Sequence, residues 1–485
     1  MSILKPRILF VTSEVYPLIK TGGLADVSCA LPNALQQLDV DIRILLPGYP
    51  SVLKALPLVE VHQQITVFPH LEPINILASV MPSGKIPIYL IDCPELYQRE
   101  GNPYQDQHGK DWPDNALRFG LLSKVAALFG QGQFLFKPEI IHCNDWQSGL
   151  APTYLHYAKQ PHARTIASIH NIAYQGIFAP AIMPLLQLPP ESFDIHGLEY
   201  YGSVSFLKAS LFYADRITTV SPTYAKDIQT PAYSYGLHGL LAERYHELSG
   251  ILNGIDTDIW NPATDKYIFT QYDTNNLAGK AENTKQLRQK LGLEPSHYKP
   301  LLGIISRLTY QKGLDLFIPI IPEIINKGAQ LAILGSGDKE LEIELQKLAK
   351  MMPGQISITL GYDEALAHQI EAGADIFLMP SLFEPCGLNQ MYSMHYGTIP
   401  IVRRTGGLAD TVIDATSENL NQQTATGFVF EQEDSRHLLQ CVERAMTAFR
   451  DKTTWQKLQK TCMLKDFSWR GSAQQYLDLY QQLIK

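Results

Sequence analysis

The stretch Lys20-Thr-Gly-Gly-Leu-Ala-Asp-Val27 follows the first strong apolar run of the chain and precedes a helical pattern. It recurs nearly intact as Arg404-Thr-Gly-Gly-Leu-Ala-Asp-Thr-Val412, again after an apolar run and before a helical stretch. Paired glycines allow positive φ and a close approach of backbone N–H groups to a ligand, and the following helix offers its positive end to an anion. A tight strand-to-helix turn explains a single copy equally well, but two copies behind a Lys or Arg favour phosphate binding.

The repeated turn indicates two similar half-chains, and 485 residues are more than one core usually serves. Short β-branched runs alternate with longer helical patterns in each half, which indicates parallel sheets covered on both faces. The expected strands are 8–11, 42–46, 88–91, 140–142, 165–169, 217–220, 301–306, 331–334, 356–360, 376–379, 399–402 and 428–430. We therefore expect an α/β protein with doubly wound domains at 1–250 and 251–466, followed by a terminal helix at 467–485 that returns to the first domain. Residues 96–113 are expected to form a long loop.

Composition excludes several classes of protein. Apolar residues make up 45% of the chain, and no apolar run is long enough to cross a bilayer. The net charge of −8 argues against a broad nucleic-acid surface. The six cysteines lie far apart, as expected for scattered thiols in a reducing compartment rather than for disulfides or zinc ligands. We expect a cytoplasmic protein, and a mature protein of the plastid stroma fits the same pattern.

Polar residues follow many of the expected strands, at the edge where open α/β sheets bind ligands. They are Lys20, Asp145, His170, Arg307, Lys312, Glu384 and Thr405, with Asn253 at the domain boundary. Asp145 also fits a helix cap, and His170 fits a hydrogen-bonded core histidine. Arg307 and Lys312, each taken alone, fit solvated surface charges. Glu384 directly precedes Pro385, which holds it extended and favours a role in hydrogen bonding.

This set of side chains suits nucleotide-sugar chemistry. The cations Lys20, Arg307 and Lys312 and the two glycine turns match a diphosphate leaving group, while the acid and imidazole groups match a hydroxylated substrate. A DxD metal motif flanked by strand residues is not present, and Asp256-Thr-Asp258 fits a turn. We therefore expect no metal and no other cofactor, because cations and helix ends replace magnesium.

A series of motifs resembles the bacterial glycogen synthases and plant starch synthases across nearly the whole chain. In order they are Lys20-Thr-Gly-Gly-Leu-Ala-Asp26, His142-Cys-Asn-Asp-Trp146, His170-Asn-Ile-Ala-Tyr-Gln-Gly176, Leu252-Asn-Gly-Ile-Asp256, Ser306-Arg-Leu-Thr-Tyr-Gln-Lys-Gly313, Glu384-Pro-Cys-Gly387 and Arg404-Thr-Gly-Gly-Leu-Ala-Asp410. The resemblance implies the GT-B fold, in which two Rossmann-like domains face each other across a deep cleft. It implies a glucan-acceptor domain followed by a nucleotide-sugar donor domain. The activity implied is transfer of glucose from ADP-glucose to the non-reducing end of an α-1,4-glucan, with retention of configuration.

The resemblance also implies roles for individual residues. Glu384 would bind the transferred glucose, and Arg307 and Lys312 would balance charge as the nucleoside diphosphate departs. His170 and Asp145 would line the sugar site. The implied donor-binding residues are Lys20, Gly22, Gly23, Asp26, Asn253, Tyr362, Cys386, Gly387, Thr405, Gly406 and Gly407, with Tyr362 stacked on the base.

Further features bear on mechanism. Related GT-B transferases have a second glutamate, which holds ribose, at the position of Tyr392. The absence of this glutamate matches the glycogen and starch synthases. No carboxylate nucleophile emerges from the sequence, so the resemblance implies a front-face displacement assisted by the leaving phosphate. Because the cations are divided between the halves, we expect the domains to close around the donor.

Alternatives remain among related activities. The first is a different GT-B enzyme, one that uses UDP-glucose or forms sucrose, and the second is a starch-synthase-like glucan-binding scaffold that has lost catalysis. The scaffold is disfavoured by intact Lys20, Arg307, Lys312 and Glu384. A dinucleotide dehydrogenase is disfavoured, because neither turn reads Gly-x-Gly-x-x-Gly. The expected partners are ADP-glucose and an α-1,4-glucan, with no nucleic acid and no membrane.

Overall fold

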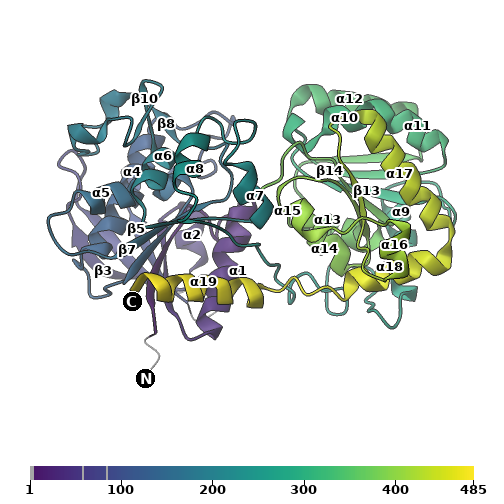
Figure 1. Ribbon diagram of the computed structural model, residues 1–485, viewed down its shortest axis with the longest axis horizontal. Helices are drawn as coiled ribbons and strands as arrows, with labels where there is room; N and C mark the ends of the chain where they lie inside the picture. Colours follow the sequence, from purple (N-terminus) through teal and green to yellow (C-terminus); the bar gives the residue numbers. More distant parts are fainter. Residues whose placement is uncertain (1–4, 57–58, 83–85, 485) are drawn as a thin grey trace. The chain divides into compact units, whose positions relative to one another are not determined.

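The computed structural model describes residues 5–56, 59–82 and 86–484, and the chain divides into two compact units (Figure 1). Unit 1 comprises Met1–Gly254 and Trp469–Lys485, and unit 2 comprises Ile255–Ser468. The sequence placed the first boundary at 250 and the start of the terminal segment at 467. The observed division after Gly254 assigns Asn253 to unit 1 rather than to the second domain.

Unit 1 is built on a nine-stranded sheet in the order β12-β11-β7-β6-β1-β2-β5-β4-β3. Its strands are β1 (Arg7–Val11), β2 (Asp41–Pro47), β3 (Glu60–Ile65), β4 (Ile74–Val80), β5 (Pro87–Asp92), β6 (Ile140–Asn144), β7 (Arg164–Ile169), β11 (Arg216–Thr219) and β12 (Leu248–Gly250). Most pairs are parallel, as the sequence predicts, but β4 pairs antiparallel with both β3 and β5. The hairpin of β3 and β4 was missed, because the largely exposed β3 lacks a continuous apolar run.

The helices of unit 1 are α1 (Gly23–Gln37), α2 (Pro50–Ala55), α3 (Pro94–Tyr97), α4 (Asn115–Gly130), α5 (Ala151–His156), α6 (Phe206–Tyr213), α7 (Pro222–Asp227), α8 (His238–Glu243) and α19 (Trp469–Ile484). A small antiparallel sheet joins β8 (Ile177–Phe178), β10 (Ser203–Ser205) and β9 (Glu199–Tyr200). These strands are too short to give a pattern in the sequence. Residues 98–113, within the expected loop, lie between α3 and α4.

The terminal helix α19 packs beside α1, as the yellow and purple ribbons of Figure 1 show. Ala473, Tyr476 and Tyr480 join the core cluster that contains Ile8 and Phe10 of β1. The Tyr480 hydroxyl lies 2.7 Å from His142 Nδ1 on β6. Burial lowers the pKa of His142 to about 3, so this imidazole is neutral and serves to anchor α19.

Unit 2 contains a six-stranded parallel sheet in the order β15-β14-β13-β16-β17-β18. Its strands are β13 (Leu301–Ile305), β14 (Gln330–Gly335), β15 (Ile356–Leu360), β16 (Ile376–Met379), β17 (Ile399–Arg403) and β18 (Phe428–Phe430). Its helices are α9 (Ala278–Lys290), α10 (Leu314–Phe317), α11 (Ile321–Asn326), α12 (Lys339–Met351), α13 (Glu364–Gly373), α14 (Asn389–His395), α15 (Gly406–Thr411), α16 (Ser417–Asn421), α17 (Ser435–Arg450) and α18 (Lys452–Met463). Each strand overlaps an expected one, because buried parallel strands read as continuous apolar runs.

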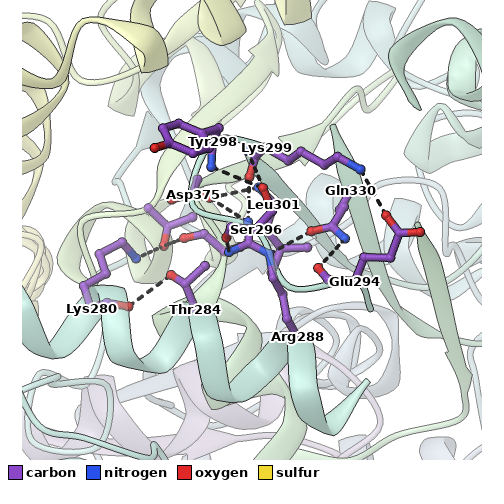
Figure 2. A network of polar contacts seen from close by, with 12 residues as sticks. Lys280, Thr284, Arg288, Glu294, Ser296, Tyr298, Lys299, Leu301, Gln330 and Asp375 are labelled. Carbon is purple, nitrogen blue, oxygen red and sulfur yellow. Dashed lines mark hydrogen bonds and ion pairs between the residues drawn. The ribbon is translucent and has the colours of Figure 1, made fainter. Parts of the chain in front are cut away.

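A buried polar network fastens the starts of β13 and β14 to α9 (Figure 2). Arg288 Nε donates to Gln330 Oε1 at 2.7 Å, and its other nitrogens donate to the carbonyls of Ser296 and Lys299. The Leu301 N–H donates to Asp375 Oδ2 at 2.8 Å. These contacts hold the amino ends of the strands, which leaves the carboxyl ends to carry the loops described below.

The described residues can be compared with the expectations about membrane spans and about cysteines. None of the helices that they form is long and apolar enough to cross a membrane. All six cysteines are buried and none forms a disulfide, as expected for scattered thiols.

Candidate active site

Polar residues gather at the carboxyl ends of three neighbouring strands in unit 2. Arg307 and Lys312 follow β13, Glu384 follows β16, and Thr405 follows β17. Because β13, β16 and β17 are adjacent in the sheet, their loops meet at one edge. The sheet order thus brings together motifs that lie up to about a hundred residues apart in the chain. The sequence analysis predicts this gathering, because residues that follow parallel strands lie at the same edge of the sheet.

Lys312 and Glu384 form a direct ion pair in which Nζ lies 2.6 Å from Oε2. The hydroxyl of Ser381 also donates to Oε2, at 3.0 Å. The side chains of Lys312 and Glu384 are only 18% and 8% exposed. Lys312 is therefore not a solvated surface charge, and it orients a nearly buried carboxylate by a charge-assisted hydrogen bond.

The loop that carries Lys312 lies directly on the loop that carries Glu384. The Leu382 N–H donates to the Gln311 carbonyl at 2.9 Å. Gly313 has φ +69°, and a Cβ at this position would lie 2.0 Å from the Pro380 carbonyl oxygen. Only glycine fits such a close backbone approach at positive φ, so this glycine fixes the distance between the two loops.

The second glycine turn supports the Glu384 loop from the other side. The Gly407 N–H donates to the Glu384 carbonyl at 3.1 Å. Gly406 has φ +43°, and an added Cβ would lie 1.9 Å from the same carbonyl oxygen. A Cβ at Gly407 would lie 2.2 Å from the Cys386 carbonyl oxygen. The turn thus packs under the Glu384 loop, and the N–H of Gly407 is already bonded to protein.

The other expected residues of unit 2 differ in exposure. Arg307 is exposed at the start of its loop. Tyr362 is 72% exposed, and it follows β15, which β14 separates from β13. Cys386 is buried, and Gly387 has φ +71° with Gln390 Oε1 2.4 Å from the position of an added Cβ. Tyr362 therefore offers an accessible ring face, whereas Cys386 and Gly387 shape the loop.

In unit 1 the first glycine turn follows β1 and is open. Lys20 Nζ lies 2.9 Å from Asp26 Oδ1, so the cation pairs with the first turn of its own helix. Gly22 and Gly23 are exposed, and an added Cβ at Gly22 would meet no described atom within 4 Å. The helix that follows, α1, is 15 residues long. The space beside Gly22 is therefore open to the close approach of a ligand.

Glu14 is a residue of this turn that sequence reasoning missed. Its Oε2 accepts from the N–H groups of Thr21 at 2.5 Å and Gly22 at 3.2 Å, and its Oε1 accepts from Thr21 Oγ1 at 2.6 Å. The Tyr104 hydroxyl also donates to Oε1. Glu14 is 2% exposed and comes just after β1, the position at which the sequence points to ligands. A carboxylate just after the first strand is the signal that could have identified it.

Asp145 uses its carboxylate to hold the loop after β7. Oδ1 accepts from the N–H groups of His170 at 2.7 Å and Asn171 at 3.4 Å, so the expected alternative of a helix cap is wrong. The backbone of Asp145 has φ 54°, a strained value for a residue with a side chain. Burial raises the pKa of Asp145 to about 7, and the negative charge of Glu14 contributes in the same direction.

His170 is held by Asn144, a second residue that sequence reasoning did not select. Asn144 donates from Nδ2 to the Val11 carbonyl at 3.0 Å, so its Oδ1 faces His170 Nε2, 2.9 Å away. His170 therefore donates from Nε2. Burial lowers its pKa to about 4, so the imidazole is neutral and Nδ1 is an acceptor.

Asn253 is 5% exposed at the end of unit 1. Its side-chain oxygen is buried without a hydrogen-bond partner among the described residues. Such an atom is unusual in a folded protein and is consistent with a ligand contact. In the described part of the chain, no group of three or more His, Cys, Asp or Glu side chains is arranged to hold a metal ion.

Comparison with known proteins finds relatives along the whole chain. The family model of the starch synthase catalytic domain matches residues 7–243, and that of glycosyl transferases group 1 matches residues 284–457. Glycogen synthase of Nitrosomonas europaea is 51% identical over 99% of this chain and 98% of that protein. Glycogen synthase 2 of Bradyrhizobium diazoefficiens is 49% identical over 99% of this chain and 98% of that protein.

Solved structures agree. The catalytic domain of starch synthase IV from Arabidopsis thaliana, bound to ADP and acarbose, matches with a TM-score of 0.90 and 33% identity over 99% of each chain. Sucrose-phosphate synthase from Thermosynechococcus elongatus matches with a TM-score of 0.61 and 17% identity over 99% of each chain, which shows the fold alone. The expectation of a GT-B fold is confirmed. The chain belongs to the glycogen and starch synthase family of glycosyltransferases.

Proposed function

We propose that this glucosyltransferase moves glucose from ADP-glucose to the non-reducing end of an α-1,4-glucan, with retention of configuration. The observation that carries the proposal is the ion pair of Lys312 and Glu384 at the meeting point of three strand ends. A cation beside a nearly buried carboxylate suits a leaving diphosphate next to a sugar. Further support comes from the glycogen synthase of Nitrosomonas europaea and from the starch synthase IV domain bound to ADP and acarbose.

In this proposal Glu384 binds the glucose ring. Lys312 and Ser381 both contact Oε2, so we assign Oε1 to a sugar hydroxyl. That bond strengthens as positive charge develops on the ring. Lys312 and Arg307 neutralise the diphosphate as it leaves, as charge-assisted contacts to phosphate do in general.

The remaining roles are assigned to residues of both units. Lys20, with Gly22 and Gly23 at the start of α1, is assigned to the phosphates. His170 accepts a sugar hydroxyl at Nδ1, because its Nε2 donates to Asn144. Tyr362 is assigned to the base, and the donor pocket is completed by Asp26, Asn253, Cys386, Gly387, Thr405, Gly406 and Gly407. Asp145 holds the loop of His170 in place.

Retention follows from a front-face displacement. The bond between C1 of glucose and the phosphate oxygen breaks, and a bond from C1 to the 4-hydroxyl oxygen of the glucan forms on the same face. The proton of that hydroxyl goes to the departing phosphate oxygen. Glu384 and Asp145 are engaged with Lys312 and with backbone amides, so we assign neither as a covalent nucleophile.

The direct test is transfer of labelled glucose to glycogen from ADP-glucose and, in parallel, from UDP-glucose. We expect ADP-glucose to give at least about a tenfold higher kcat/KM, a difference of about 1.4 kcal/mol. An α-linked product, identified by NMR of the extended oligosaccharide, is expected for retention. A preference for UDP-glucose overturns the donor assignment, and absence of transfer from both donors favours a glucan-binding scaffold.

We also propose that transfer needs no divalent ion and no other cofactor, because Lys20, Arg307 and Lys312 supply the positive charge. EDTA should leave the initial rate largely intact. A loss that magnesium or manganese restores would contradict this proposal. A reducing compartment, the cytoplasm, suits the six buried and unbridged cysteines.

A further inference from the structure

Glu14 joins parts of unit 1 that lie far apart in the sequence. Its carboxylate bonds the backbone of Thr21 and Gly22 in the turn after Lys20. It also accepts the hydroxyl of Tyr104 from the segment between α3 and α4. A 2% exposed carboxylate with four donors is strongly held, because unpaired buried charge is costly.

The carboxylate occupies the N–H groups that precede α1. A negative group near a helix amino end is stabilised by the helix dipole and by the unpaired amides there. Since the N–H groups of Thr21 and Gly22 are bonded to Glu14, a diphosphate would lie in the open space beside Gly22 and bind Lys20 and the N–H groups from Gly23 onward. The turn is thus organised by the protein itself before any donor binds.

Tyr104 extends this organisation to a second element. Its hydroxyl lies 2.8 Å from Ser13 Oγ, and its carbonyl accepts from Asn115 Nδ2 of α4 at 2.9 Å. Residues 97–103, just before it, line a cavity of about 540 Å³ that Ile19 also lines. The residue just before Lys20 and the residues just before Tyr104 therefore border the same cavity.

We propose that Glu14 is a positioning residue that holds the Lys20 turn in the geometry that receives the donor diphosphate. It acts through the backbone of Thr21 and Gly22 and does not itself touch the donor. The inference rests on the proposed donor site at Lys20. It predicts a selective effect on donor binding, because the contacts of Glu14 are concentrated on the turn and on Tyr104.

The test compares Glu14→Ala and Glu14→Gln with Glu139→Ala. Glu139 is a matched control, because its Oε2 accepts from the Arg7 N–H at 3.0 Å, at the opposite end of β1. Glu14→Ala should raise the KM for ADP-glucose about tenfold, as expected for losing bonds to a charged group, while the KM for glycogen stays within about twofold. Glu14→Gln should raise it less, because its amide oxygen still accepts one N–H. The control should change neither constant.

A double mutant separates positioning from an independent effect. If Glu14 acts through the Lys20 turn, Glu14→Ala should add little to the loss already caused by Lys20→Gln. Additive effects overturn the inference, as does an unchanged donor KM in a folded Glu14→Ala or Glu14→Gln variant. An equal rise in the KM values for donor and glycogen, with a lowered Tm, also overturns it, because general loss of structure produces that result.

The outcome also distinguishes this inference from the proposed function. If the unmodified protein does not use ADP-glucose, the proposed function fails. If it does and the Glu14 variants bind the donor normally, only the positioning role fails. Should Glu14→Ala not fold, Tyr104→Phe removes only the link from the second element, and a selective rise in donor KM is again the expected result.

Discussion

The two glycine turns share the sequence Thr-Gly-Gly-Leu-Ala-Asp but have different surroundings. Thr21, Gly22 and Gly23 are exposed, and the turn is bonded to the carboxylate of Glu14. Thr405–Gly407 is buried, and its backbone is bonded to the carbonyl of Glu384. The first turn is therefore open to solvent beside Gly22, whereas the second is packed against another loop.

The two turns also differ in the helix that follows each turn and in the ion pair of the cation that precedes it. The helix after the first turn, α1, has 15 residues, and Lys20 pairs with Asp26 at its start. The helix after the second turn, α15, has six residues, and Arg404 pairs with Glu431 at 2.6 Å. Both cations are thus ion-paired, and the two turns differ in burial and in the length of the helix that follows. Repetition of a motif thus does not imply repetition of its role.

The largest effect is expected at the residue that the second turn supports. Glu384→Ala should lower kcat by roughly two to three orders of magnitude, the scale of losing one contact made in the transition state. The measurement is turnover with labelled ADP-glucose, with circular dichroism to verify the fold. Near normal turnover in a folded variant would show that the second turn supports a loop without a catalytic role.

Next in size is the effect of Gly406→Ala. The new Cβ would lie 1.9 Å from the Glu384 carbonyl oxygen, at a φ of +43° that alanine rarely adopts. The left-handed conformation alone costs about 1–2 kcal/mol, and the displaced Glu384 loop should lower kcat about tenfold or more. Thermal unfolding should show a lower Tm, and the turnover assay should show a lower kcat. A variant with normal Tm and kcat would contradict the packing role of this turn.

Burial, together with the carboxylate of Glu14 that bonds the first turn, raises the pKa of Asp145, and this second carboxyl group should make stability depend on pH. Glu14, His170 and Tyr224 are the titratable groups near Asp145, whose pKa of about 7 exceeds the usual carboxyl value because of burial. The folded state therefore binds this proton more tightly than the unfolded state, and the stabilisation is lost as pH rises toward 7. Asp145→Asn should remove this dependence and gain about 2 kcal/mol relative to wild type between pH 5 and pH 8.

Denaturant unfolding at several pH values measures the difference between Asp145→Asn and wild type. The Asn side chain can still accept from the His170 N–H, so the contact itself is conserved. A difference that is constant over this pH range would show that Asp145 has an ordinary pKa in the folded protein.

The smallest effect is expected for Gly22→Ala, the counterpart of Gly406→Ala. Gly22 has φ −159°, an extended conformation open to any residue, and no described atom lies within 4 Å of the new Cβ. Stability should change by less than about 0.5 kcal/mol, as is usual for surface substitutions. A large loss of stability would show that the first turn is packed like the second, and the comparison would fail.

Much of the fold could be predicted because of how parallel strands are buried. The strands of unit 2 are covered on both faces and read as apolar runs, so each could be located in the sequence. The strand β3 (Glu60–Ile65) has the sequence EVHQQI and lies at an exposed edge. It forms by pairing with β4, which is information that its own residues do not carry.

The sequence predicts at which edge of the sheet the candidate site lies, but it does not predict which side chains of the site contact one another. Lys312 and Glu384 follow adjacent strands, so the sheet order places both at one edge. Their ion pair depends on the close backbone approaches at Gly313 and Gly406, which only three-dimensional packing reveals. The role of Glu14 could not be predicted, because its bonds to the backbone of Thr21 and Gly22 depend on how the chain folds back after β1. The alternatives for Asp145 were separated only by its bond to His170.

The helix α19 has a consequence for how the chain is made. Unit 1 needs Ala473, Tyr476 and Tyr480 to cover Ile8 and Phe10, yet the ribosome completes unit 2 before it reaches them. During synthesis of unit 2, the first part of unit 1 therefore exposes an apolar surface of the kind that chaperones bind. A circular permutant that begins with α19 would give unit 1 its complete core at the start of translation.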